Sequence, residues 1–189
     1  MSEKHLVTCE NANALWDHFE FKYRLKIRQK RKSRTMKVAG WFLQRLGYMS
    51  RADFLDRFVT TVGRYVFIYR DFLTARGYGA ALHALETAPH EVEHVKQKIK
   101  AWKYLLSKTE LVKYEVPAFC TNIEFHHYLT GDVLDPERLA GRLSSYGIKK
   151  GSKQWRYAVE TYRTVGRMTK KGMYKSELVK EAIAFLEIR

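Results

Sequence analysis

The chain has very few cysteines and no long apolar run. Its 189 residues include only Cys9 and Cys120, and neither has the spacing of a metal ligand. Two such cysteines argue against a disulfide framework. No segment approaches the roughly 18 apolar residues that span a bilayer, and the N-terminal residues lack the apolar region of a signal peptide. We therefore expect a cytoplasmic protein without membrane contact, or one inside a particle assembled in the cytoplasm.

Acidic residues are also scarce relative to basic ones. The chain has 20 Asp and Glu against 35 Lys and Arg, which gives a net charge of +15. A field of this sign attracts polyanions such as nucleic acid, an anionic surface or an acidic protein. No recognised nucleic-acid-binding motif is present, which argues against base-specific recognition. The length and the 46% of hydrophobic residues suit one domain with a small extension.

The most informative segment is residues 90–97, which read HEVEHVKQ. Histidines four residues apart lie one above the other on a helix, so the imidazoles of His90 and His94 can reach one metal ion. Glu91 follows about 100° further round the helix, where its carboxylate can hold a water molecule beside the metal and accept its proton. This spacing is typical of zinc-dependent hydrolases. The alternative is a surface helix whose two histidines face water.

A third ligand is needed, because catalytic zinc takes at least three protein ligands and keeps one position open for water. The best downstream candidate is Glu115, in a segment that we expect to be helical up to about Thr130 and to end at Gly131. If this helix packs on the first, Glu115 can complete the site. Alternatively, Glu115 lies in the first turn of its helix and only favours the helix N-terminus electrostatically.

Together, the H-E-x-x-H-x-x-Q of residues 90–97 and the E-x-x-A-F of residues 115–119 resemble the small gluzincin-like zincin metallopeptidases. Residues 58–69 resemble the hairpin that precedes the active helix in that family, so the likeness covers roughly residues 55–130. The resemblance implies that His90, His94 and Glu115 bind zinc. It also implies that Glu91 is the general base for hydrolysis of a protein or peptide substrate. Such small zincins are common among phage and prophage proteins, which suggests a virion-associated setting.

Pro89, directly before the first histidine, departs from the family pattern. A proline inside a helix removes one hydrogen bond and crowds the preceding turn, at about 3 kcal/mol. The helix therefore either kinks at Pro89 or begins there, with proline at its first position. In the second case His90 would lie in the first helical turn, where its orientation is less well fixed.

The remaining pattern predicts an α+β fold, with a short twisted sheet packed by helices. Residues 19–28 alternate strictly between apolar and mostly basic side chains, which predicts a strand with one buried face. We expect a helix over residues 36–46, two strands around Gly63 within residues 59–69, and a helix from about 80 to 106 that is interrupted or restarted at Pro89. The second strand of the hairpin could pair with an extended substrate.

After Gly131 we expect a mostly helical segment. Asp135 before Pro136 is typical of an N-cap followed by proline at the first helical position. Residues 155–168 and 176–188 predict two further helices. We assign residues 1–131 to a zincin-like core and residues 132–189 to a basic helical extension.

Basic residues cluster at 22–37 and 149–175, where they could contact a phosphate backbone. The candidates in the first cluster are Lys22, Arg24, Lys26, Arg28 and Arg31. The alternative is a solvated basic face whose aromatic neighbours turn inward. A second functional hypothesis is therefore a non-enzymatic phage, virion or assembly protein on a zincin scaffold, contacting nucleic acid through this basic surface.

His126, His127 and Tyr128 follow Glu115 by about three helical turns. One of them could stabilise a tetrahedral intermediate, a role that a His or Tyr can take in a hydrolytic site. The alternative is a set of partly exposed helix residues.

Overall fold

The computed structural model describes residues 6–45, 47, 49–98 and 107–189. Most of them are helical, with a small sheet, so the predicted α+β class is confirmed. The first half contains α1 (Cys9–Tyr23), β1 (Lys26–Gln29), the 3-10 turn η2 (Lys30–Lys32), α2 (Arg34–Arg45), α3 (Arg51–Arg57), β2 (Thr60–Val62) and β3 (Tyr65–Ile68). The second half contains α4 (Tyr78–Lys96), α6 (Lys108–Thr130), α7 (Pro136–Gly141), the 3-10 segment η3 (Arg142–Tyr146), α8 (Lys153–Thr169) and α9 (Glu177–Glu187).

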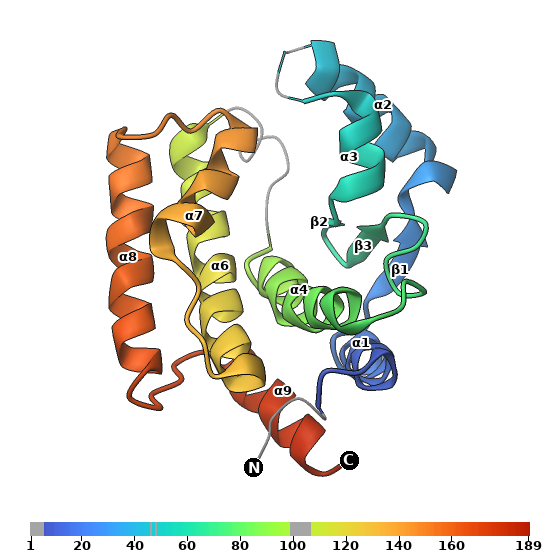
Figure 1. The fold of residues 1–189 in the computed structure, drawn as a ribbon. Coiled ribbons are helices and arrows are strands. Elements are labelled where there is room, and N and C mark those ends of the chain that lie inside the picture. Colours follow the sequence, from blue (N-terminus) through green and yellow to red (C-terminus); the bar gives the residue numbers. More distant parts are fainter. Residues whose placement is uncertain (1–5, 46, 48, 99–106) are drawn as a thin grey trace.

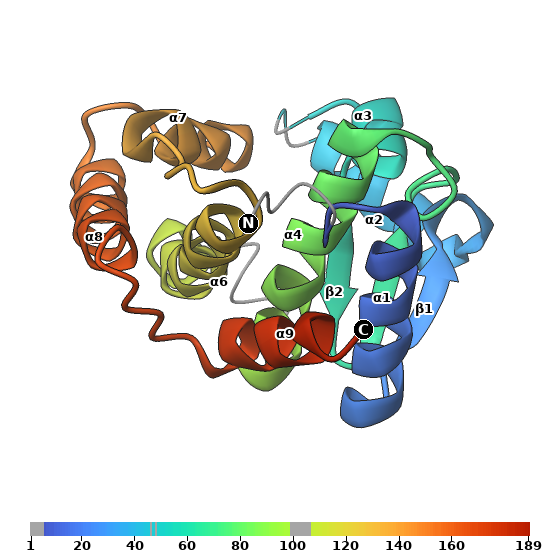
Figure 2. The same cartoon turned by 60° about the horizontal axis from the view of Figure 1, so that its bottom comes forward.

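Helix α4 occupies the centre of the molecule. The sheet and α1 lie on one side of α4 and α6 lies on the other, with α7 and α8 covering α6 (Figures 1 and 2). The last helix, α9, packs against α1, α4 and α6 (Figure 2). Helix α4, which carries His90 and His94, therefore lies between the sheet and α6, which carries Glu115.

The predicted hairpin is confirmed. Strands β2 and β3 pair antiparallel, with Val62 opposite Tyr65, and Gly63 at φ +60° supports the tight turn between them. Strand β1 pairs with β3 in parallel, so the order in the described sheet is β1-β3-β2. The expectation that the second hairpin strand could receive a substrate is therefore wrong, because β3 is paired on both sides and β2 is an edge strand.

The strand predicted for residues 19–28 is wrong over most of its length. Residues up to Tyr23 belong to α1, and only Lys26–Gln29 form a strand. Arg24, at φ 52°, ends the helix in the left-handed conformation. The alternation begins inside a helical pattern, because the buried face of α1 already follows i, i+3, i+4 and i+7 spacing. That face consists of Ala12, Leu15, Trp16 and Phe19.

Pro89 lies inside α4 and does not begin it. The helix begins at Tyr78, so His90 is more than three turns from the N-terminus, and its orientation is set by a continuous helix. The described part of α4 ends at Lys96. The predicted continuation to residue 106 falls partly on residues 99–106, which lie outside the described residues.

The predicted C-terminal helices are confirmed. Asp135 Oδ1 accepts a hydrogen bond from the Arg138 N–H at 2.6 Å, and Pro136 is the first residue of α7. Helix α6 ends at Thr130, and Gly131 caps it in the left-handed conformation at φ 77°, as expected from the sequence. Helices α8 and α9 cover nearly the ranges expected from the sequence.

The C-terminal segment shares its hydrophobic core with the rest of the chain. One cluster of buried residues joins α1, β3, α4 and α9, and includes Trp16, Leu85 and Leu178. A second cluster joins α6 to the following helices and includes Phe119 and Tyr162. Residues 132–189 are therefore packed against the segment predicted to be the core.

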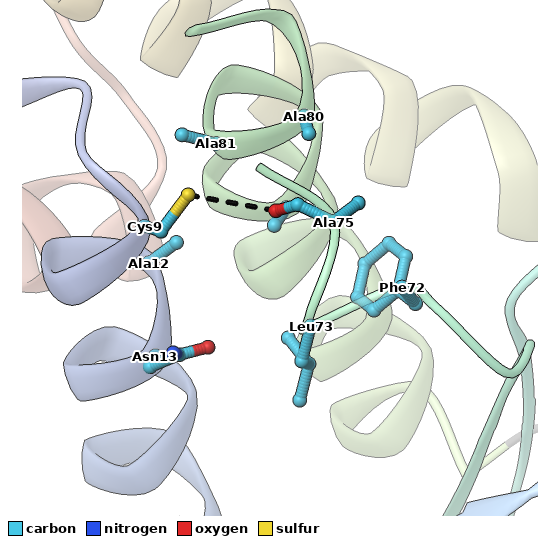
Figure 3. Close-up of a pocket in the computed structure, with 9 residues that line it drawn as sticks. Cys9, Ala12, Asn13, Phe72, Leu73, Ala75, Ala80 and Ala81 are labelled. Carbon is cyan, nitrogen blue, oxygen red and sulfur yellow. Dashed lines mark hydrogen bonds between the residues drawn. The ribbon is translucent and has the colours of Figure 1, made fainter. Parts of the chain in front are cut away.

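Small side chains allow α1 and α4 to approach closely at their N-terminal ends. Figure 3 shows Cys9 and Ala12 of α1 beside Ala80 and Ala81 of α4. The Cys9 thiol donates a weak hydrogen bond to the Ala75 carbonyl at 3.5 Å. This junction anchors the first turns of the helix that carries the two histidines. No helix among the described residues is long and apolar enough to cross a bilayer.

Candidate metal centre

His90 and His94 from α4 meet Glu115 from α6. His90 Nε2 lies 3.8 Å from Glu115 Oε2, and His94 Nε2 lies 3.7 Å from Glu115 Oε1. One ligand atom from each residue lies within 4.8 Å of the others, and no other described group of His, Cys, Asp and Glu has this arrangement. Atoms placed tetrahedrally at about 2.1 Å from one ion would be roughly 3.4 Å apart. The three side chains therefore need only small adjustments to bind one metal ion.

The antiparallel packing of α4 and α6 explains this convergence. Contacts between the helices run in opposite order along the two chains: Gln97 with Tyr114, His94 with Glu115, and His90 with Asn122. Helix α6 begins at Lys108, so Glu115 is in its interior, and Glu110 is the acidic residue of the first turn. The alternative role for Glu115, as a first-turn charge that favours the N-terminus of its helix, is therefore excluded.

Hydrogen bonds orient the two imidazoles. His90 Nδ1 lies 2.7 Å from Asn122 Oδ1, and the Asn122 amide donates to the Glu86 carbonyl at 2.9 Å. Because the amide oxygen can only accept, Nδ1 of His90 carries the proton and Nε2 keeps its lone pair facing Glu115. Partners of this kind fix the tautomer of metal-binding histidines. Asn122 was missed in the sequence, although it lies two helical turns after Glu115.

The last residue of the H-E-x-x-H-x-x-Q pattern has the same role for the second histidine. Gln97 Oε1 lies 3.2 Å from His94 Nδ1, and the Gln97 amide donates to the Tyr114 carbonyl at 3.2 Å. Gln97 therefore orients His94 and also joins α4 to α6 next to Glu115.

The candidate site is buried, and burial affects the pKa of His90. The exposed fractions are 9% for His90, 6% for His94 and 2% for Glu115. Burial, assisted by the neighbouring His94, lowers the pKa of His90 to about 3. At neutral pH this imidazole is uncharged, which is the form that binds metal ions.

Glu91 lies in the same space and is held from the edge strand. The Thr61 hydroxyl, on β2, donates to Glu91 Oε2 at 2.6 Å. Burial raises the pKa of the Glu91 carboxyl, while His94, the Thr61 hydrogen bond and Lys30 act in the opposite direction. Thr61 is 30 residues from Glu91 in sequence, and no local pattern indicates this contact.

Lys30 is fully buried, and its charge acts on Glu91 of this site. Its Nζ donates to the carbonyls of Phe54 at 2.8 Å and Phe58 at 3.0 Å, and lies 3.7 Å from the centre of the Phe54 ring. Burial lowers the pKa of Lys30 to about 7, against the opposing effect of Glu91. Lys30 binds the end of α3, directly before the strand that carries Thr61. In the sequence it is one member of an ordinary basic run.

His126, His127 and Tyr128 have partners away from the candidate metal centre. His126 Nδ1 pairs with the Glu86 carboxylate, His127 with the Tyr174 hydroxyl at 2.9 Å, and Tyr128 with Glu187 at 3.5 Å. His126 follows Glu115 by eleven residues, which is about 16 Å along the helix. These contacts join the three side chains to residues other than His90, His94 and Glu115.

The five candidate nucleic-acid contacts are all exposed, but some have acidic partners. Lys22 pairs with Glu181 at 2.9 Å, and Arg31 binds Asp56 through two hydrogen bonds of 2.6 Å. Lys26 lies over the Tyr65 ring at 5.5 Å.

Comparison of the chain with protein-family models, with curated proteins and with solved structures gives no match. The case for a function therefore depends on the residues and geometry of the candidate site.

Proposed function

We propose that the chain is a zincin-like metallopeptidase, in which His90, His94 and Glu115 hold a zinc ion and Glu91 is the general base. The observation that carries this proposal is the convergence of the three ligand atoms within 4.8 Å on two antiparallel helices. The burial of Glu91 beside them adds a candidate for proton transfer. The fold brings Glu115 of α6 against His90 and His94 of α4, from which it is distant in the sequence.

The donor set fits zinc. Two imidazole nitrogens and one carboxylate oxygen form the ligand set of catalytic zinc in metallopeptidases. The same set also suits non-haem iron, so the donors alone do not select the metal. Glu91 favours hydrolysis, because its carboxylate is bound by Thr61 and is not one of the three ligands. When bound, zinc would polarise the scissile carbonyl and lower the pKa of a water molecule.

The protein's own residues would then move the proton. Glu91 accepts a proton from the attacking water and passes it to the leaving amine, as a general base that becomes a general acid. The hydrogen bond from Thr61 fixes one carboxylate oxygen and leaves the other oxygen for the water. Asn122 and Gln97 keep the imidazoles oriented throughout.

An extended polypeptide is the substrate class that best fits the fold. Strand β2 is at the edge of the described sheet and packs against α4. A peptide can add to such an edge through main-chain hydrogen bonds. Since β2 also carries Thr61, a peptide bound there would lie next to Glu91. The edge strand β2 thus replaces β3 as the proposed substrate strand.

Protein purified without chelator should be incubated with an unstructured protein substrate, and new peptide termini identified by mass spectrometry. We expect cleavage by the wild type and none by His94→Ala. Glu91→Gln should lower the rate by about 10²–10⁴, because it removes the general base. Full activity in Glu91→Gln would overturn the assignment of the base, and cleavage retained in His94→Ala would overturn the metal-dependent mechanism.

The alternative, nucleic-acid contact through residues 22–31, has less support. Lys22 and Arg31 already bind carboxylates, which lowers their availability for phosphate groups.

A further inference from the structure

Helix α2 presents large apolar side chains to solvent beside several cations. Val38, Trp41 and Phe42 are 65%, 54% and 51% exposed. The helix contains no acidic residue, and its basic residues Arg34, Lys37 and Arg45 are all exposed. Burial of these apolar side chains by a partner would be favourable.

The orientation of α2 follows from its packing. Arg34, Val38, Trp41 and Arg45 have i, i+4, i+7 and i+11 spacing, so they form one ridge. The opposite side buries Met36 and Gly40. A Cβ on Gly40 would lie only 2.9 Å from the Phe54 ring, so glycine permits the close approach of α3. The ridge therefore faces outward because the other side of α2 is fixed against α3.

A shallow hollow of about 240 Å³ lies beside this ridge, lined by Lys37, Val38, Trp41 and Arg51. The Arg51 N–H bonds to the side chain of Gln44 at 3.3 Å, which fixes the start of α3 against α2. In the described part of the chain, no ion pair involves any of the four cations of this face, Arg34, Lys37, Arg45 and Arg51. The hollow is smaller than the roughly 300 Å³ at which pockets for drug-sized ligands begin. It suits a single ring system with negative charge nearby.

We propose that this face of α2 binds single-stranded nucleic acid. One base would stack on the exposed indole of Trp41, and the flanking phosphates would lie against Lys37 and Arg51. Cationic surfaces with exposed aromatic rings bind single strands in this way, because every unpaired base offers a flat face. In a duplex these faces are already stacked. The inference is independent of the metal centre and of the basic residues 22–31.

The distribution of charge argues against two other partners. Helices that lie on a membrane separate an apolar side from a cationic side, whereas α2 has Arg34, Val38, Trp41 and Arg45 on the same ridge. A second copy of the chain would bring like charges together on this face. A polyanion that carries its own aromatic rings can pair with the positive charge of this face and also cover the Trp41 ring.

The test is fluorescence anisotropy with a labelled oligothymidine of about 20 nucleotides and with a hairpin duplex of equal phosphate number, at several salt concentrations. We expect the single strand to bind more tightly than the duplex. Trp41→Ala should weaken single-strand binding at least about fivefold. Lys37→Ala with Arg51→Ala should lower the slope of log affinity against log salt by about 1.4.

Matched controls separate this site from general attraction to the positive charge. Phe21→Ala removes an exposed ring of α1. Arg76→Ala with Lys108→Ala removes the same charge at two exposed positions outside both basic clusters. Both variants should bind like the wild type. Circular dichroism and thermal unfolding confirm that each variant is folded. Normal single-strand binding by folded Trp41→Ala overturns the proposal. An equal loss of affinity in the Lys37 and Arg51 double variant and in its double-variant control also overturns it. So does equal competition by polyglutamate, or binding to phosphatidylserine vesicles without binding to the oligonucleotide.

Discussion

Single residues outside the ligand set hold the candidate metal centre in shape. Asn122 accepts from His90 and donates to the Glu86 carbonyl, so it fixes one imidazole relative to both helices. Gln97 does the same for His94. These amides do not reach the metal position, yet they determine which nitrogen of each histidine faces it.

We expect Asn122→Ala to lower zinc affinity by about 10- to 100-fold, the usual effect of removing the partner of a metal-binding histidine. The affinity is measured by competition with a chromophoric chelator. Asn13→Ala, at an exposed position on α1, is the matched control and should bind zinc like the wild type. Unchanged affinity in Asn122→Ala would contradict the orienting role of this amide.

Lys30 gives a residue-scale prediction for pH. Its pKa is lowered to about 7 by burial, from about 10.5 in the unfolded chain. Between these values the unfolded state binds more protons than the folded state, so this group makes the folded state more stable as the pH rises from 7 to about 10. Below pH 7 both states carry the proton and the contribution no longer changes.

Thermal unfolding of the wild type and Lys30→Met between pH 6 and 9 checks this prediction. The difference in unfolding free energy between the wild type and the variant should increase in favour of the wild type as the pH rises above about 7. A difference that is independent of pH would mean that Lys30 keeps its ordinary pKa in the folded protein.

At the scale of elements, one buried carboxylate adds to the apolar packing that attaches α9. Glu124, on α6, accepts hydrogen bonds from the Lys175 N–H at 3.0 Å and the Ser176 N–H at 2.9 Å. Ser176 is also the N-cap of α9. The carboxylate therefore fixes the chain where it enters the last helix.

Glu124→Ala leaves these two N–H groups without their acceptor, and we expect it to lower the unfolding free energy by about 1–3 kcal/mol. Urea unfolding measures this change. Glu160→Ala, on the exposed side of α8, should change stability by less than about 0.5 kcal/mol. If both variants were equally stable, Glu124 would not anchor α9.

The elements also indicate how far the sequence could be interpreted. Local signals sufficed for the hairpin at Gly63, the N-cap at Asp135 and the helix end at Gly131. The strand predicted for residues 19–28 is confirmed only from Lys26 onward, because the preceding residues continue a helical pattern that begins at Ala12. Propensity and period are local, whereas the competing helix gains its stability from packing with α4 and α9.

The residues of the candidate site likewise fall into those that the local sequence indicates and those that only tertiary contacts show. Spacing within one helix indicated His90, Glu91 and His94. The need for a third ligand pointed to Glu115 on the next helix, and the resemblance implied the same residue. Asn122, Thr61 and Lys30 were not found, because their roles arise only from contacts between elements that are distant in the sequence.

At the scale of the whole molecule, the candidate metal centre lies where the two hydrophobic clusters meet. Helix α4 supplies two histidines and packs in the first cluster, while α6 supplies Glu115 and packs mainly in the second. The Phe119 ring is 4.9 Å from His90 and 6.2 Å from Tyr162 of α8. Changes in the packing of one cluster on the other would therefore alter the distances between the ligands.

The most direct test of the account is the zinc content of protein purified without chelator, measured by mass spectrometry for the wild type and His94→Ala. We expect about one zinc per chain in the wild type, and little in the variant, because two ligands remain. His83→Ala, which removes a histidine of the same helix outside the group, should retain the metal. Absence of zinc from the wild type even after addition of zinc at neutral pH, or full retention in His94→Ala, would contradict the proposed metal centre.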